Sequence, residues 1–380
     1  MSMNQRKSSY NQFLNLSSNM SKLYFFITNR MVTNKTKYVN SNFNCKNNYD
    51  TNNYIYYFTI YLSLLSALLL FSMIFVANAA AFDSNATKYG FIKKWGSKGT
   101  GDGQFQRVHD LDFDPTEKYL YTIDRRGDRV QVFDKDGNFI KKWGSNGTAD
   151  GQFNLPYSVD VDSKGDVWVA DRGNHRIQKF DKDGNFLFKF GSFGSKEGQF
   201  IKPRQVVVDK DIKYLYVADS ENHRIQKFDT KGNFIKSWGT LGSGDGQFSL
   251  PVTVIIDSKG DIIVNDRGTS RVQKFDSDGN FILKFGSTGT GNSQFSEVEH
   301  MATDTYDNIY VNDPQLGDTG SGKPSVKKFD TNGNFITKFG SLGSGDGEFT
   351  DPEHLAIDSD GNVYVSDREA NTIQVFKPVQ

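Results

Sequence analysis

The 380-residue chain is poor in cysteine, proline and histidine, with 1, 8 and 5 of them. The single cysteine, Cys45, lies outside the repeated part of the chain, which excludes a disulfide framework or a cysteine-based zinc site there. An excess of either charge is also lacking, because the chain has 45 basic and 45 acidic side chains. Without the seven bases and one acid of residues 1–53, the remainder has 38 bases against 44 acids, which disfavours a nucleic-acid partner.

Glycine and aromatic residues, in contrast, are abundant and recur at a fixed interval. An aromatic-Gly pair occurs six times, at steps of 48, 47, 48, 47 and 54 residues: Trp95-Gly96, Trp143-Gly144, Phe190-Gly191, Trp238-Gly239, Phe285-Gly286 and Phe339-Gly340. Self-similarity at this period indicates copies of one small unit that stack or close into a ring, because a single unit cannot bury its own apolar face.

The repeated unit consists of strands. Its second copy, residues 156–192, holds four short runs rich in Val, Ile, Phe, Tyr and Trp, without helical periodicity. Polar turns separate the runs, and the pair Asp183-Gly184 is a strong hairpin signal, since glycine tolerates the positive φ that such turns require. Four antiparallel strands, here named a to d, predict a propeller blade.

The ring is expected to have six blades and to close. Six innermost strands are predicted, around Leu111, Val159, Val206, Val254, Met301 and Leu355. The sixth copy ends at Phe376 after three strands, whereas Gly90–Gly96, before the first inner strand, matches the outer-strand phrase. We therefore predict an all-β, six-bladed β-propeller of four-stranded antiparallel blades, in which Gly90–Gly96 completes the C-terminal blade and removes a free sheet edge.

The sequence before the propeller has a different character. Residues 1–53 are predicted to be a disordered basic leader, residues 54–81 a hydrophobic segment, and residues 82–380 the propeller. The uncharged run 56–76 is long enough to span a bilayer, and the bases before it orient its C-terminal side outward. The small residues 77–79 suit a signal peptidase, so the segment is either a signal peptide or a retained transmembrane anchor. Met1, Met20 and Met31 stay open as start sites, and the propeller is predicted to be secreted or anchored to the outer face of the cytoplasmic membrane.

One string in each of four copies carries a family resemblance. Asp171–Phe180 (DRGNHRIQKF) resembles the NHL repeat, and so do Asp219–Phe228, Asp266–Phe275 and Asp367–Phe376. The resemblance covers residues 89–377. It implies the propeller fold but no particular chemistry, since this fold serves binding modules and enzymes alike.

The d-to-a and b-to-c loops of all blades must share one face, and we expect binding there. Each d-to-a loop ends in a phenylalanine that is expected to fill space between blades: Phe105, Phe153, Phe200, Phe248, Phe295 and Phe349. The residues that follow at the start of strand a differ around the ring. We predict that the ligand-binding residues are found among them, beneath the loop Pro314–Pro324: His109, Tyr157, Arg204, Glu299, His300, Glu353 and His354.

Two interpretations of this cluster stay open. One is a polar channel lining of hydrogen-bonded side chains. The other is a divalent metal site, for zinc or calcium, with ligands drawn from one set: His109, Glu299, His300, Glu353 and His354. Strand alternation is expected to let only one of two adjacent residues face the axis, which weakens the metal interpretation. Residues at the rim are also expected to contribute little to blade packing.

Peptidyl-hydroxyglycine amidating lyases are similar six-bladed propellers, and the resemblance implies zinc-binding histidines just after the inner-strand proline. His109 matches that position, whereas Glu299 and Glu353 occupy two others. Arginine stands at the position of the catalytic arginine in four copies, which suggests a structural role such as pairing with the preceding aspartates. These arginines are Arg125, Arg172, Arg267 and Arg368. The position of the catalytic tyrosine is not matched, because other residues stand there: Gly173, Glu221, Gly268 and Glu369.

The sequence therefore favours a recognition scaffold without assigned catalytic residues. Its partner would be a protein, a peptide, a glycan or a small molecule, with the membrane as a further partner if the hydrophobic segment is uncleaved. The alternative is a metal-dependent lyase or hydrolase that uses the His/Glu cluster.

Overall fold

The computed structural model describes residues 88–314 and 323–379. The predicted leader 1–53, the hydrophobic segment 54–81 and most of the loop Pro314–Pro324 lie outside these residues. Within the described residues, no helix has the length and apolar character needed to cross a membrane. The predictions of a signal peptide or anchor, of export and of the start site stay predictions.

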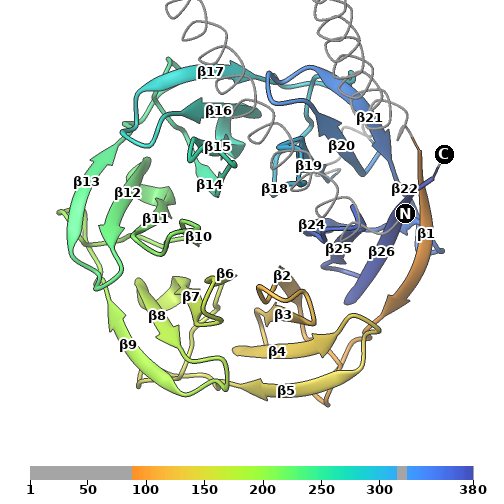
Figure 1. Ribbon diagram of the computed structural model, residues 1–380, viewed down its shortest axis with the longest axis horizontal. Coiled ribbons are helices and arrows are strands. Elements are labelled where there is room, and N and C mark those ends of the chain that lie inside the picture. Colours follow the sequence, from red (N-terminus) through yellow and green to blue (C-terminus); the bar gives the residue numbers. More distant parts are fainter. Residues whose placement is uncertain (1–87, 315–322, 380) are drawn as a thin grey trace, which may run out of the picture. The chain divides into compact units, whose positions relative to one another are not determined.

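Six four-stranded antiparallel sheets surround a common axis, as Figure 1 shows. The first three blades are β2 (Val108–Phe113), β3 (Tyr119–Asp124), β4 (Arg129–Asp134), β5 (Phe139–Trp143); β6 (Ser158–Val161), β7 (Val167–Asp171), β8 (Arg176–Phe180), β9 (Phe186–Phe190); and β10 (Gln205–Val208), β11 (Tyr214–Asp219), β12 (Arg224–Asp229), β13 (Phe234–Trp238). In each of them the chain runs from the innermost strand to the outermost.

The last three blades complete the ring. They are β14 (Pro251–Ile256), β15 (Ile262–Asp266), β16 (Arg271–Phe275), β17 (Phe281–Phe285); β18 (Met301–Thr303), β19 (Ile309–Asp313), β20 (Ser325–Phe329), β21 (Phe335–Phe339); and β24 (Pro352–Ile357), β25 (Val363–Asp367), β26 (Thr372–Val379) with β1 (Lys88–Trp95). Short parallel strands β22 (Ser341–Leu342) and β23 (Glu348–Phe349) pair within the last d-to-a loop. In blades 2, 3 and 4 a 3-10 turn follows strand b: η1 (Arg172–Asn174), η2 (Ser220–Asn222) and η3 (Arg267–Thr269).

The N-terminal strand closes the ring as the sequence predicts. β1 pairs antiparallel with β26, from Lys88 opposite Val379 to Trp95 opposite Ile373. Tyr89 also reaches the neighbouring blade, where its ring stacks on Phe339 at 4.4 Å between centroids. The strand thus completes blade 6 and packs against blade 5. The predicted range Gly90–Gly96 was two residues too late at its start and one at its end.

The apolar core lies between blades. The predicted phenylalanines at the ends of the d-to-a loops are all 0% exposed. Phe153, for example, shares one buried cluster with Val130 of blade 1 and Val159 of blade 2. Six such clusters follow the ring among the described residues. Each blade is therefore stabilised mainly by its neighbours, which is why closure matters.

A buried aspartate at the end of strand b fixes the loops on the d-to-a and b-to-c face of each blade. In blade 2, Asp171 accepts hydrogen bonds from the backbone of Asn154 (2.8 Å) and from the side chains of Arg176 (2.7 Å) and Gln178 (3.1 Å). Arg176 in turn donates to three carbonyl oxygens of the preceding d-to-a loop. The same aspartate–arginine pair recurs in three further blades: Asp124–Arg129, Asp219–Arg224 and Asp266–Arg271. The repeated spacing of this aspartate and arginine thus connects strand c to the loop before strand a.

Candidate functional site

The seven predicted site residues lie where the innermost strands begin, on the face of the d-to-a and b-to-c loops. His109 is in β2 and Glu353 and His354 are in β24, whereas the others directly precede β6, β10 and β18. All seven are at most 8% exposed. The seven residues are thus buried, and the expectation that they contribute little to blade packing stays a prediction. We call this set, together with the arginines described below, the mouth.

Irregular strand pairing explains why adjacent residues are buried together. The register of β2 with β3 shifts between Val108 and Leu111, around His109 and Asp110. The register of β24 with β25 shifts in the same way around Glu353 and His354. Such an irregularity re-aims side chains at a sheet rim. Strict alternation was thus the wrong expectation for these two blades, because both members of each pair are buried at the mouth.

Four aromatic rings form a row across the mouth, from blade 5 through blades 6 and 1 to blade 2. The ring centroids of His300 and His354 are 3.8 Å apart, those of His354 and His109 4.7 Å, and those of His109 and Tyr157 4.0 Å. Blades 5 and 1 can contribute to one row only because the ring closes. The row is therefore a direct consequence of the β1–β26 pairing.

Burial keeps the three histidines neutral near pH 7. It lowers the pKa of His354 to about 3 and those of His109 and His300 well below their ordinary value. His109 Nε2 is 2.9 Å from Glu353 Oε1, but the ring nitrogens of His109 are not oriented to form a hydrogen bond. The contact is close without being a well-formed bond. The ring nitrogens of a neutral His109 can therefore still form hydrogen bonds with a further molecule.

Asp110 connects two blades as well as a histidine. Its carboxylate accepts backbone hydrogen bonds from Leu111 (2.7 Å) and, in the next blade, Val159 (2.8 Å). One oxygen lies 2.6 Å from His354 Nδ1. Burial is the main cause that raises the pKa of Asp110 to about 7. Asp110 directly follows His109 in the sequence but was not among the predicted site residues.

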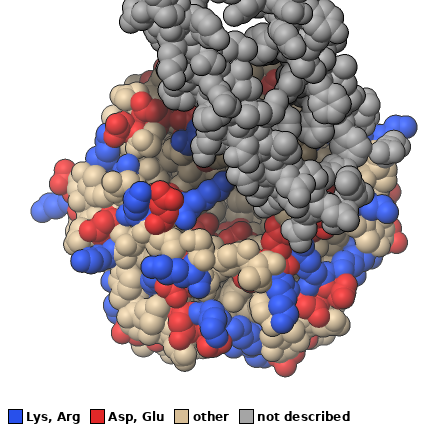
Figure 2. Space-filling model, in the orientation of Figure 1, with Lys and Arg blue, Asp and Glu red and all other residues tan. Residues whose placement is uncertain are grey.

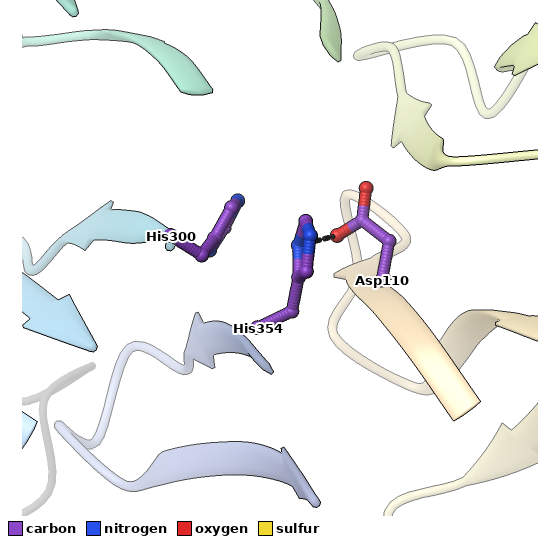
Figure 3. A group of neighbouring side chains, drawn as sticks. All are labelled: Asp110, His300 and His354. Atoms are coloured by element: carbon purple, nitrogen blue, oxygen red, sulfur yellow. Dashed lines mark ion pairs between the residues drawn. The ribbon is translucent and has the colours of Figure 1, made fainter. Parts of the chain in front are cut away.

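Asp110, His300 and His354 form the one group in the described part of the chain whose ligand atoms converge as a metal site requires, all within 4.8 Å of one another. Figure 3 shows the three side chains meeting from β2, the segment before β18, and β24. However, His300 Nδ1 accepts a hydrogen bond from the backbone of Leu355 (3.2 Å), so the proton of the neutral ring is on Nε2. His300 then has no free lone pair. In this arrangement the group does not fit a three-ligand metal site, and three predicted ligands (His109, Glu299 and Glu353) lie outside it.

The repeated arginines do not pair with the aspartates that precede them, so that expectation is wrong. Three of these four aspartates bind the arginine five residues later, as Asp171 binds Arg176, whereas Thr372 stands at that position after Asp367. Two of the repeated arginines form ion pairs with acidic side chains of the mouth instead. Arg267 is 2.8 Å from Glu299, and Arg368 is 2.6 Å from Glu353. Arg125 and Arg172 instead reach Tyr157, as described below.

These arginines are the functional candidates that sequence reasoning missed. Their position matched that of the catalytic arginine in the amidating lyases, so a signal was present in the sequence. It was set aside because the residue recurs in four copies. The structure shows that repetition in a closed ring brings the copies together at one mouth rather than distributing them over a surface.

Comparison with known proteins identifies the repeat. The family model of the NHL repeat matches residues 153–180, 200–228 and 349–376, in blades 2, 3 and 6. The chain carries NHL repeats. Each match begins at a buried d-to-a phenylalanine and ends at the last phenylalanine of strand c. No curated protein sequence matches the chain.

Several solved structures resemble this NHL propeller. A protein of unknown function from Bacteroides thetaiotaomicron VPI-5482 is 19% identical with a TM-score of 0.59, over 76% of this chain and 75% of that one. A catalytically inactive virginiamycin B lyase from Staphylococcus aureus, with quinupristin, is 9% identical with a TM-score of 0.53, over 77% and 100%. Hydrazine synthase from Kuenenia stuttgartiensis is 14% identical with a TM-score of 0.52, over 76% and 80%. At these identities the similarity shows the fold alone.

Outside the mouth, charges of both signs are mixed. In Figure 2, basic and acidic side chains are mixed over the surface of the described residues. Many pair at the surface between an outermost strand and a d-to-a loop, as Lys189 does with Asp150 and Lys284 with Asp245. The visible surface thus agrees with the balanced composition.

The raised pKa of Asp110 predicts a pH-dependent contribution to stability. The ordinary pKa of 3.8 becomes about 7 on folding, so the folded state binds the proton more tightly than the unfolded state does. The stabilisation is complete below about pH 4 and is lost as the pH rises through 7, at about 1.4 kcal/mol per pKa unit. Relative to Asp110→Asn, the wild type should therefore lose stability from pH 4 to pH 7. Denaturant midpoints of both proteins across this range would check it, and parallel curves would show that Asp110 titrates normally.

Proposed function

We propose that this NHL propeller is a recognition scaffold that binds a ligand at the mouth. The observation that carries the proposal is a concentration of buried polar atoms without a hydrogen-bond partner in the protein. Among the described residues they include His109 Nδ1, His300 Nε2 and the Nε atoms of Arg125, Arg172 and Arg204. Each such group costs free energy unless a further molecule completes its bonds. They come from four blades (1, 2, 3 and 5) and gather at the mouth, which supports ligand binding there.

A ligand screen with face-specific variants tests the proposal. Small metabolites, peptides and glycans would be screened for an increase in the thermal midpoint of the purified protein. The matched mouth variant is Tyr157→Phe, which removes only the hydroxyl. Lys164→Ala and Asp183→Ala alter the short turns of the opposite face. We expect the mouth variant to weaken binding about tenfold, as the loss of one hydrogen bond implies, and the turn variants to have no effect. Loss of binding in the turn variants alone would place the site on the other face.

We also propose, from the sequence, that the propeller acts outside the cytoplasm. The support is the apolar run 56–76 with the bases before it and the small residues 77–79 after it. A reporter fused after Gln380 should be found beyond the cytoplasmic membrane. N-terminal sequencing would then show whether the apolar run is cleaved. A cytosolic reporter would contradict this part of the proposal.

The alternative, a metal-dependent lyase or hydrolase, is favoured by one observation, the convergence of Asp110, His300 and His354. It requires His300 to give up its bond to Leu355. We therefore expect the purified protein, analysed for bound metals after dialysis without chelator, to contain well below one zinc or calcium per chain. Stoichiometric metal that is lost in His300→Gln but kept in His175→Gln would favour the enzyme instead.

A further inference from the structure

Three arginines from consecutive blades surround one tyrosine at the mouth. The guanidinium carbons of Arg125, Arg172 and Arg204 lie 5.1, 5.6 and 5.2 Å from the ring centroid of Tyr157. Arg204 also donates a hydrogen bond to the Tyr157 hydroxyl at 3.2 Å. Arg125 follows β3, Arg172 begins η1 and Arg204 precedes β10, so each comes from a different blade. Equivalent ends of three consecutive blades therefore bring these arginines together.

None of these three guanidinium groups forms an ion pair within the described part of the chain. The arginines on the other side of the mouth behave differently, because Arg267 and Arg368 are paired with acidic side chains. Arg204 is only 8% exposed, and its Nε has no partner in the protein. Buried cations without anions are rare, since removing a charge from water is costly unless an opposite charge compensates.

The surroundings affect two of these cations differently. Burial opposes the charge of Arg204, but Tyr157 and the carboxylates of Glu299, Glu221 and Glu353 outweigh it and raise the pKa of Arg204 above its ordinary value. The pKa of Arg172 is lowered to about 10, first by burial and then by the neighbouring charges of Arg204 and Arg125. The Tyr157 ring offers these cations an attractive face, but the attraction of one ring is shared among three. An anion placed among them would relieve both the repulsion and the missing hydrogen bonds.

We propose that Arg125, Arg172, Arg204 and Tyr157 bind an oxyanion group of the ligand, a carboxylate or a phosphate. The inference rests on the ligand-binding function proposed above and adds the chemistry of one ligand group. Guanidinium groups present planar pairs of N–H donors that match the oxygens of both anions. The Tyr157 hydroxyl, which accepts the bond from Arg204, can donate its own proton to the same group.

The position of the anion follows from the division of charge. Glu299 and Glu353 lie across the mouth and repel a second anion, while their own charges are matched by Arg267 and Arg368. The histidines between the two halves stay neutral and do not attract an anion. The acidic group of the ligand is therefore directed to blades 1 to 3, and the rest of the ligand extends over the row of rings toward blades 5 and 6.

A competing explanation is that the three arginines only pack on Tyr157 and stabilise the fold. The two explanations differ in what anions do. We would measure the thermal midpoint of the full chain at increasing sodium phosphate or sodium acetate, with sodium chloride at equal ionic strength as the reference. The variants are Arg172→Met, which keeps the apolar stem, and the matched control Arg126→Met, which removes an exposed arginine from the same kind of loop.

We expect phosphate or acetate to raise the midpoint of the wild type and of Arg126→Met above the chloride reference. In Arg172→Met the apparent dissociation constant should rise about tenfold. A stronger effect of phosphate would indicate a phosphorylated ligand, and a stronger effect of acetate a carboxylate ligand. Equal midpoints in all three salts, or equal anion effects in wild type and Arg172→Met, would overturn the inference. If neutral ligands from the screen bind at the mouth while neither anion does, the inference fails and the proposed function stands.

Discussion

Deletion of residues 88–95 is expected to abolish cooperative thermal unfolding of the propeller. These residues form β1, and their loss exposes the edge of β26 along its pairing from Val379 to Ile373. It also removes Tyr89 from its stacking contact with Phe339 of blade 5. An unpaired edge beside apolar rings favours aggregation, and the ring loses the outer part of the contacts between blade 6 and blade 5. Calorimetry should show a broad or absent transition, with aggregation on heating.

The control for this deletion is the missing strand supplied in trans. A synthetic peptide of residues 88–96 should restore part of the transition, whereas a peptide of the same composition in scrambled order should not. A truncated protein that melts like the full chain would contradict closure by β1. The row of rings would then lose its explanation, because it needs blades 5, 6 and 1 to be contiguous.

Asp171→Ala is expected to lower the free energy of unfolding by about 3–5 kcal/mol, the cost of breaking a buried ion pair from one side. Asp171 is 0% exposed and accepts the bond from Arg176, which organises the d-to-a loop. The matched control is Asp150→Ala, which removes an exposed partner of Lys189 and should cost at most about 1 kcal/mol. Chemical denaturation of the three proteins would measure both values. A similar small loss in both variants would show that the aspartate of the motif does not hold the fold together.

Much of the fold could be predicted because its signals are local and repeated. The aromatic-Gly pairs and the Asp-Gly turns specify strands and hairpins within one copy, and the spare strand at residues 90–96 specifies closure. The buried phenylalanines could be predicted for the same reason, since each ends an equivalent loop. Strand ends were less certain, because the pairing of β1 begins two residues before the repeated phrase does.

The site was predicted only in part, because it depends on departures from the repeat. The seven selected residues do lie at one mouth. Asp110 was not selected, and a shifted register of β2, which no local pattern indicates, accompanies the burial of both Asp110 and His109. Arg125 and Arg172 were set aside because repeated residues were expected to serve the repeat itself. In a closed ring, however, equivalent positions converge, so that a repeated side chain can form a site.

The central claim is that the unpaired arginines of the mouth serve a ligand rather than the fold. The most direct measurement is the free energy of unfolding of Arg172→Met without any ligand, compared with the wild type in a buffer of chloride salts alone. Removing the cost of burying this cation, and with it the repulsion from Arg204 and Arg125, should raise the stability by on the order of 1 kcal/mol, a figure reduced for the solvent exposure of Arg172. A loss of stability of that size or more would mean that Arg172 holds the mouth together, and would contradict the claim.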